Sequence, residues 1–225
     1  MKKTFAALLI AFLAGLLLAG TSAAAEKSPM SAEQAEKLMK DGSQRFIKAY
    51  CGKTPKQGNK CLTDVAMRQA PFAVVVACSD SRVPPELLFD RGIGDLFIIR
   101  LAGNIVDDAA LGSIEYAVDH LGTPLVVVMG HKRCGAVQAT VEAVEKNQQV
   151  PGHLPALVDA LKPAVEQVKD QPGDKVDNAV RANIKLITAK LKAAEPVLAP
   201  AVKAGKVRVL GAYYDLDNGK VTFVQ

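Results

Sequence analysis

The chain has 225 residues, of which 49% are hydrophobic and 23% are charged, and its formal net charge is +5. This composition is ordinary for a soluble globular protein and argues against a fibrous or disordered chain. The basic residues are spread along predicted helical segments and form no run interleaved with aromatic residues. We therefore expect a solvated surface and no nucleic-acid partner.

Residues 1–25 have the order of a secretory signal peptide. A basic start is followed by an apolar run over residues 5–18 and by small residues that end in three alanines. We expect cleavage after Ala25, export to the periplasm, and a single domain over residues 26–225 without membrane attachment. The alternative is an uncleaved membrane anchor, which the short apolar run disfavours because a spanning helix needs about 20 residues.

The first part of the mature chain predicts a helix over residues 31–50 and a second, short helix over residues 62–68. Ser31 can cap the first helix, with Glu33 and Gln34 in its first turn.

Cys51 and Cys61 flank a polar loop that lies between these two helices and lacks metal-ligating neighbours. Because thiols tend to pair in an oxidising compartment, we predict a local disulfide between them. Two free thiols are the alternative.

Five short apolar or β-branched runs predict strands over residues 72–77, 96–99, 124–129, 206–210 and 221–224. The first three lack polar alternation, which is typical of parallel strands covered on both faces. An Asn-Gly turn at residues 218–219 precedes the last run and predicts an antiparallel edge strand.

Helical patterns lie between the strands, over residues 109–121, 136–145, 154–168 and 179–191, with Asp177 and Asn178 as candidate caps of the last helix. The alternation of strands and helices predicts the α/β class. We expect a mostly parallel central sheet with an antiparallel edge strand and helices on both faces.

Two motifs follow buried strands directly. One is Cys78-Ser-Asp80-Ser-Arg82, and the other is Gly-His131-Lys-Arg-Cys134-Gly. Two thiols, an imidazole and a carboxylate suit tetrahedral zinc. If the first and third strands are neighbours, their carboxyl ends meet where the strand order reverses, and the ligands come together there.

Two features decide how these residues are interpreted. The alternatives to a metal site are that Cys78 and Cys134 are plain buried thiols or that they pair with each other. Arg82 offers Asp80 a second partner, so the carboxylate is a ligand that can leave the metal. A site with a removable ligand is suited to catalysis.

The sequence resembles the β-class carbonic anhydrases. The matching stretches, in the order found in that family, are residues 69–71, 77–84, 97–104, 112–118, 130–131 with 134–135, and 211–220. The resemblance implies zinc-dependent, reversible hydration of carbon dioxide to bicarbonate and a proton through zinc-bound hydroxide. Cys78, His131 and Cys134 would be permanent zinc ligands. Asp80 would be the fourth ligand in a closed form and pair with Arg82 in an open form.

The resemblance also implies a substrate pocket and a dimer. Phe97, Ala102 and Tyr116 would line the pocket, with Gln69 hydrogen-bonding the substrate oxygens. His120 would be a proton shuttle, or else an exposed histidine without a role. We expect a homodimer or a higher multiple, with the helix over residues 31–50 packing across the partner subunit.

Two other functions remain open at this point. A hydrolase of CS2 or COS on the same scaffold would act on similarly linear, apolar molecules. A noncatalytic zinc or redox-sensing protein would need no exchangeable ligand, so the Asp80–Arg82 pair argues against it.

Overall fold

The structure, a computed structural model, describes residues 30–51 and 65–224. The predicted signal peptide lies outside the described residues, and so does Cys61 of the predicted Cys51–Cys61 disulfide. The chain divides into two compact units with the boundary after Phe46. Within residues 30–51 and 65–224, no helix has the length and apolar character that crossing a membrane requires.

Most of the described part of the first unit belongs to helix α1 (Ala32–Cys51), which the sequence predicted and which continues past Phe46. Its amino end is closed by a reciprocal pair of hydrogen bonds. The Gln34 N–H donates to Ser31 Oγ over 3.3 Å, and the Ser31 N–H donates to Gln34 Oε1 over 2.8 Å. This capping box satisfies two N–H groups that would otherwise lack partners, and it confirms Ser31 as the cap.

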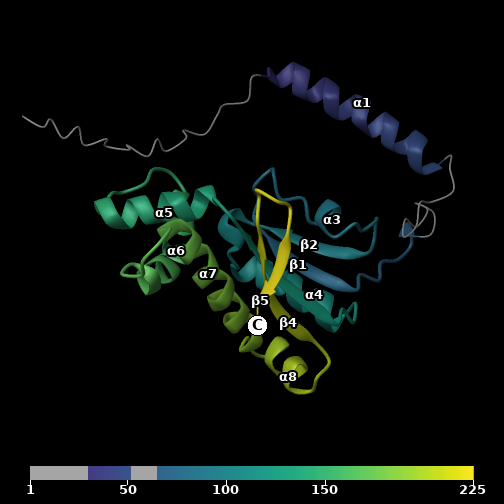
Figure 1. The fold of residues 1–225 in the computed structure, drawn as a ribbon. Coiled ribbons are helices and arrows are strands. Elements are labelled where there is room, and N and C mark those ends of the chain that lie inside the picture. The colour runs from purple at the N-terminus through teal and green to yellow at the C-terminus, as the bar shows by residue number, and fades with distance from the viewer. Residues whose placement is uncertain (1–29, 52–64, 225) are drawn as a thin grey trace, which may run out of the picture. The chain divides into compact units, whose positions relative to one another are not determined.

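The second unit is built on a five-stranded sheet with the order β2-β1-β3-β4-β5 (Figure 1). The strands are β1 (Ala73–Ala77), β2 (Leu96–Arg100), β3 (Leu125–His131), β4 (Arg208–Tyr214) and β5 (Val221–Val224). All pairs are parallel except β4–β5, so the expected α/β class and antiparallel edge are confirmed. The strand order reverses between the neighbours β1 and β3, which places a crevice at their carboxyl ends.

Strands β3 and β4 are longer than the sequence predicted. Their pairing continues through Gly130 opposite Tyr213 and His131 opposite Tyr214. The prediction ended each strand early because a glycine, Gly130 or Gly211, interrupts each apolar run. His131 is consequently the last residue of a strand, held by the sheet.

The helices of this unit are α3 (Pro85–Leu88), α4 (Asp108–Asp119), α5 (Gly135–Lys146), α6 (Leu154–Val168), α7 (Lys175–Lys192) and α8 (Leu198–Lys203), together with a 3-10 turn, η1 (Ala102–Asn104). The predicted helices 109–121, 136–145, 154–168 and 179–191 correspond to α4 to α7. Three elements, α3, η1 and α8, were not predicted, because six or fewer residues show no helical period. The sequence predicted a short helix over residues 62–68. Of the part that the structure describes, residues 65–68, only Val65 is helical.

One face of the sheet is covered by α4, α7 and α8. Val76 and Val128 from the strands pack there with Ile114 of α4, Leu191 of α7 and Leu198 of α8, all buried. This layer is the main core, and burial of such aliphatic side chains is the dominant favourable term in folding.

The opposite face carries Val75, Val127 and Met129, and α3 covers part of it through Leu88 and the adjacent Phe89. Helices thus lie on both faces, as predicted, although within residues 65–224 the second face has only this short one.

The cap of α7 differs from the prediction. The helix begins at Lys175, and the side chain of Asp174 accepts hydrogen bonds from the N–H groups of Val176 and Asp177. Asp177 and Asn178 therefore lie inside the first turn and are not its cap. The apolar period starts only at Ala179, which is why the sequence pattern placed the helix start too late.

Candidate metal centre and active site

Three metal-binding side chains meet at the crevice between β1 and β3. Cys78 follows β1 directly, His131 ends β3, and Cys134 caps α5. Their ligand atoms, two Sγ and a ring nitrogen, all lie within 4.8 Å of one another, and the three residues are buried. The first and third strands are neighbours in the sheet, as predicted, and this brings together ligands that are far apart in sequence.

Hydrogen bonds set the direction of two of these ligands. His131 Nδ1 lies 3.0 Å from the Lys132 carbonyl oxygen and donates to it, so the lone pair is on Nε2. Nε2 is buried and has no hydrogen-bond partner. The Gly103 N–H donates to Cys78 Sγ over 3.2 Å. Asn183 on α7 donates to the Gly103 carbonyl over 2.8 Å, so both backbone polar groups of Gly103 are bonded.

The two thiols are electrostatically linked. Cys78 Sγ and Cys134 Sγ are 3.9 Å apart. The hydrogen bond from Cys134 is the largest cause that lowers the pKa of Cys78, and His131 and the Gly103 N–H lower it further. The same contact and burial raise the pKa of Cys134. Cys78 is therefore prepared to be a thiolate, the form in which cysteine binds metals.

The arrangement fits zinc. A buried imidazole nitrogen without a partner is costly unless a metal or another group satisfies it. Two sulfurs and this nitrogen converge on one point, and such a donor set with a remaining open position is typical of catalytic zinc sites. The residues that hold the metal are Cys78, His131 and Cys134.

Asp80 lies beside this triad and faces Arg82. Arg82 Nε donates to Asp80 Oδ1 over 2.9 Å and Nη2 donates to Oδ2 over 2.7 Å, a two-pronged ion pair. These hydrogen bonds lower the pKa of Asp80 to about 2. Asp80 Oδ2 is nevertheless only 3.8 Å from His131 Nε2. The carboxylate is thus adjacent to the metal position while it is bonded to the arginine.

Arg100 fixes the main chain of the same loop. Its guanidinium donates to the carbonyl oxygens of Cys78 over 2.9 Å and of Asp80 over 2.6 Å. Arg100, Gly103 and Asn183 were not among the predicted site residues. The first two lie inside a stretch that matched the family, but nothing in the sequence indicates the backbone contacts they make.

The residues predicted for the substrate pocket are not all brought together. Ala102 lies next to Gly103 and so beside Cys78. Phe97 on β2 and Tyr116 on α4 contact each other, with ring centroids 6.4 Å apart. His120 stacks on Tyr116 at 5.1 Å and is exposed.

Within one copy of the chain, Gln69 lies far from the triad. It is exposed and precedes β1, whereas Cys78 follows β1. Thr123, just before β3, donates to the Pro71 carbonyl over 3.1 Å and ties this segment to the amino-terminal edge of the sheet. A five-residue strand of roughly 16 Å therefore separates Gln69 from the metal ligands.

Comparison with known proteins agrees with this site. A family model described as carbonic anhydrase matches residues 73–221. A carbonic anhydrase of Mycolicibacterium smegmatis is 38% identical over 185 residues, which are 82% of this chain and 89% of that protein.

Two solved structures are similar in fold. The β-carbonic anhydrase CcaA has a TM-score of 0.72 at 24% identity, covering 85% of this chain and 95% of that one. A structure from the tetrameric β-carbonic anhydrases of Sordaria macrospora has a TM-score of 0.70 at 24% identity, covering 86% and 98%.

The fold, the Cys-His-Cys triad and the similar proteins all indicate one class, a zinc lyase built on a mostly parallel sheet. The chain belongs to the β-class carbonic anhydrases. It catalyses the reversible hydration of carbon dioxide to bicarbonate and a proton, with zinc held by Cys78, His131 and Cys134.

Proposed function

We propose that Asp80 and Arg82 control access to the metal during carbon dioxide hydration. The observation that carries this proposal is the two-pronged Arg82–Asp80 pair, whose carboxylate lies 3.8 Å from His131 Nε2. A small rotation of the Asp80 side chain would exchange the arginine for the metal. Arg82 keeps the carboxylate away by charge-assisted hydrogen bonds, and the fourth position is then open to a reactant.

When bound, zinc supplies Lewis acidity that makes water a competent nucleophile near neutral pH. The chain's own residues supply the rest. His131 is oriented by the Lys132 carbonyl, and Cys78 by the Gly103 N–H. Arg100 holds the loop that carries Asp80. These fixed contacts keep the ligands in position, so little reorganisation is needed during the reaction.

The carbon dioxide pocket is proposed to be small and apolar, lined by Phe97, Ala102 and Tyr116. Gln69 would hydrogen-bond the substrate oxygens. Because Gln69 lies at the opposite end of β1 from Cys78, it can serve such a pocket only from a second copy of the chain. The pocket thus supports the proposal of a dimer.

His120 is proposed as the proton shuttle. Its ring stacks on Tyr116 at 5.1 Å, and its side chain is exposed, so one side of the ring faces the pocket aromatics and the other faces solvent. An exposed imidazole can carry a proton between the pocket and buffer.

A homodimer or a multiple of it is proposed, as is export to the periplasm after loss of residues 1–25. The less covered sheet face supports the dimer. A groove of about 380 Å³ lies there above Val75 and Val127, and Phe72 and Phe223 on its rim are half exposed. Leu38 and Met39 of α1 are exposed as well, as expected of a helix that packs on a partner. Export is supported by the sequence pattern of residues 1–25.

The test is stopped-flow carbon dioxide hydration by the purified chain and by Asp80→Asn, with zinc content measured for both. The substitution keeps the shape of the side chain but removes the charge that pairs with Arg82, so we expect kcat to fall about 10- to 100-fold with zinc still bound. Unchanged kcat would remove Asp80 from the mechanism.

Carbonyl sulfide hydrolysis is assayed on the same samples, and a rate above that for carbon dioxide would reassign the substrate. Glu166→Gln, which breaks an exposed helix pair with Lys162, is the matched control and should retain full activity.

A further inference from the structure

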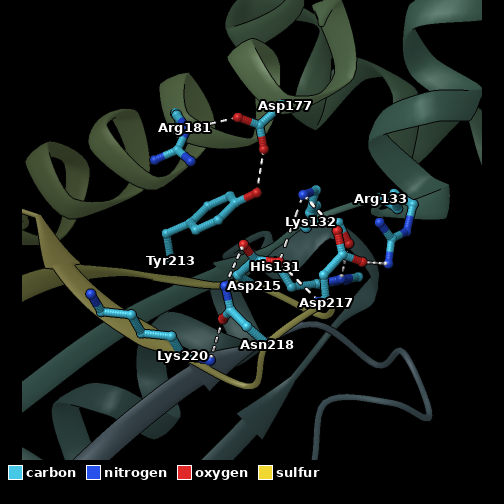
Figure 2. A network of polar contacts seen from close by, with 10 residues as sticks. All are labelled: His131, Lys132, Arg133, Asp177, Arg181, Tyr213, Asp215, Asp217, Asn218 and Lys220. Atoms are coloured by element: carbon cyan, nitrogen blue, oxygen red, sulfur yellow. Dashed lines mark hydrogen bonds and ion pairs between the residues drawn. The ribbon is translucent and has the colours of Figure 1, made fainter.

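The hairpin between β4 and β5 reaches the loop that joins two of the zinc ligands. Lys132 and Arg133 are the only residues between His131 and Cys134 in the chain. Figure 2 shows the side chains of both directed toward Asp217 in the hairpin. A single carboxylate therefore contacts every residue that separates these two ligands.

The contacts are charged and specific. Lys132 Nζ donates to Asp217 Oδ2 over 2.8 Å, and Arg133 Nη2 donates to Asp217 Oδ1. Arg133 and then Lys132 are the main causes that hold the pKa of Asp217 far below that of an ordinary carboxyl. Asp217 is thus a full anion whenever the protein is near neutral pH.

Asp217 is itself held in place. Its N–H donates to Asp215 Oδ1 over 2.9 Å, and the hairpin is closed by the Asp215 N–H, which donates to the Lys220 carbonyl over 2.9 Å. The Lys132 N–H donates to the Tyr214 carbonyl over 2.9 Å and continues the β3–β4 ladder up to the ligand loop. The hairpin is therefore a fixed support for that loop.

Arg133 connects this support to the Asp80–Arg82 pair. Its φ of +53° lies in the left-handed region, which is unfavourable for a residue other than glycine and has to be stabilised by other contacts. In this conformation its carbonyl accepts from Arg82 Nη2 over 3.3 Å. The same Nη2 donates to Asp80 Oδ2 over 2.7 Å.

We propose that Asp217 is a positioning residue for the zinc site. By pairing with Lys132 and Arg133 it holds the ligand loop and the strained Arg133 backbone, and the Arg133 carbonyl in turn orients Arg82 toward Asp80. The second half of this inference rests on the proposed role of Asp80, whereas the first half concerns zinc retention alone. Loss of the Asp217 charge should loosen the loop between two ligands and also bias Asp80 away from Arg82.

The test measures zinc transfer from the holoenzyme to a coloured chelator, together with carbon dioxide hydration, for Asp217→Asn, Asp217→Glu and Arg133→Ala. We expect Asp217→Asn to release zinc about three- to tenfold faster, the size expected for two partly exposed charged contacts. Asp217→Glu keeps the charge and should restore most of the zinc retention. Since Asp217→Asn already removes the contact that Arg133→Ala removes, the combined variant should release zinc little faster than Asp217→Asn alone.

Glu145→Gln is the matched control, because it breaks a comparably exposed ion pair with Lys175 and should leave zinc release unchanged. The proposal is overturned if Asp217→Asn releases zinc at the wild-type rate, or if Asp217→Glu behaves like Asp217→Asn. It is also overturned if the double variant shows the full product of the single effects. If the wild type holds zinc but does not hydrate carbon dioxide, the proposed function is wrong. The zinc-release measurements would still test the role of Asp217 in zinc retention.

Discussion

Two glycines show how single residues fix the shape of the site. Gly130 and Gly211 lie on neighbouring strands beneath α7, where Ile184 packs directly on both. A Cβ on Gly130 would lie 2.8 Å from Ile184 Cδ1, and one on Gly211 would lie 2.7 Å from Ile184 Cγ2. The absent side chains let α7 approach the sheet next to His131, so these glycines are a packing requirement.

Gly130→Ala should destabilise the protein by about 1–3 kcal/mol, because the new methyl group overlaps a buried side chain. Chemical unfolding followed by far-UV circular dichroism measures the change. The control is Gly112→Ala in α4, where nothing lies within 4 Å of the new Cβ and the residue is exposed. That variant should be more stable by about 0.5–1 kcal/mol, since alanine is the better helix former. Equal effects of the two substitutions would refute the packing explanation.

Residue-level prediction succeeded where a side chain carries the chemistry and failed where a backbone group does. Cysteine and histidine after buried strands are visible in the sequence. The Gly103 N–H that contacts Cys78, and the Asn183 amide that bonds to the Gly103 carbonyl, are not visible in this way. Any residue has an N–H, so its role depends on where the fold places it.

Among the elements, α7 packs against the strand that carries His131 and against its neighbour. It packs on β3 and β4, and its first turn carries Asp177, to which the Tyr213 hydroxyl donates (Figure 2). The guanidinium of Arg181, also on α7, lies 3.8 Å from the centre of the Tyr213 ring and pairs with Asp177. The helix start is thus linked to β4, one residue from the pairing partner of His131.

The Asp174 cap should therefore matter for stability. Asp174→Ala removes an acceptor for two N–H groups, those of Val176 and Asp177, and should cost about 1 kcal/mol. Asp174→Asn retains the acceptor oxygen and should lose much less. Thermal unfolding of both variants is compared with that of Asp170→Ala, an exposed position before the same turn that caps no helix. A loss with Asp170→Ala as large as with Asp174→Ala would show that the cap is not the cause.

At the scale of the whole molecule, the uneven covering of the sheet is the main feature. One face is buried under α4, α7 and α8, whereas the other keeps an apolar groove beneath Phe72 and Phe223. Exposed apolar surface of this kind commonly marks an interface. The proposed substrate role of Gln69, which lies at the opposite end of β1 from Cys78, also requires a second copy.

The variant Phe72→Glu with Phe223→Glu should convert the proposed dimer into monomers, because two carboxylates would have to be buried in an apolar interface. Light scattering after size exclusion measures the mass. The variant should also lose most carbon dioxide hydration activity, since Gln69 of the second copy would no longer complete the pocket. The control Leu154→Glu changes a similarly exposed residue outside the groove and should remain a dimer. A double variant that stays dimeric would place the interface elsewhere.

The sequence by itself determined the five strands, the main helices and the three zinc ligands, because apolar periodicity and metal-binding side chains are local properties of the chain. The fold alone establishes that β1 and β3 are neighbours, that Arg100 bonds to the Asp80 carbonyl, and that Asp217 contacts the loop between His131 and Cys134. Each of these depends on strand order and on contacts between residues far apart in sequence, such as Asp217 with Lys132. Side-chain chemistry can be read from one position, whereas a hydrogen bond across the sheet exists only once the packing of the whole domain has set the distance.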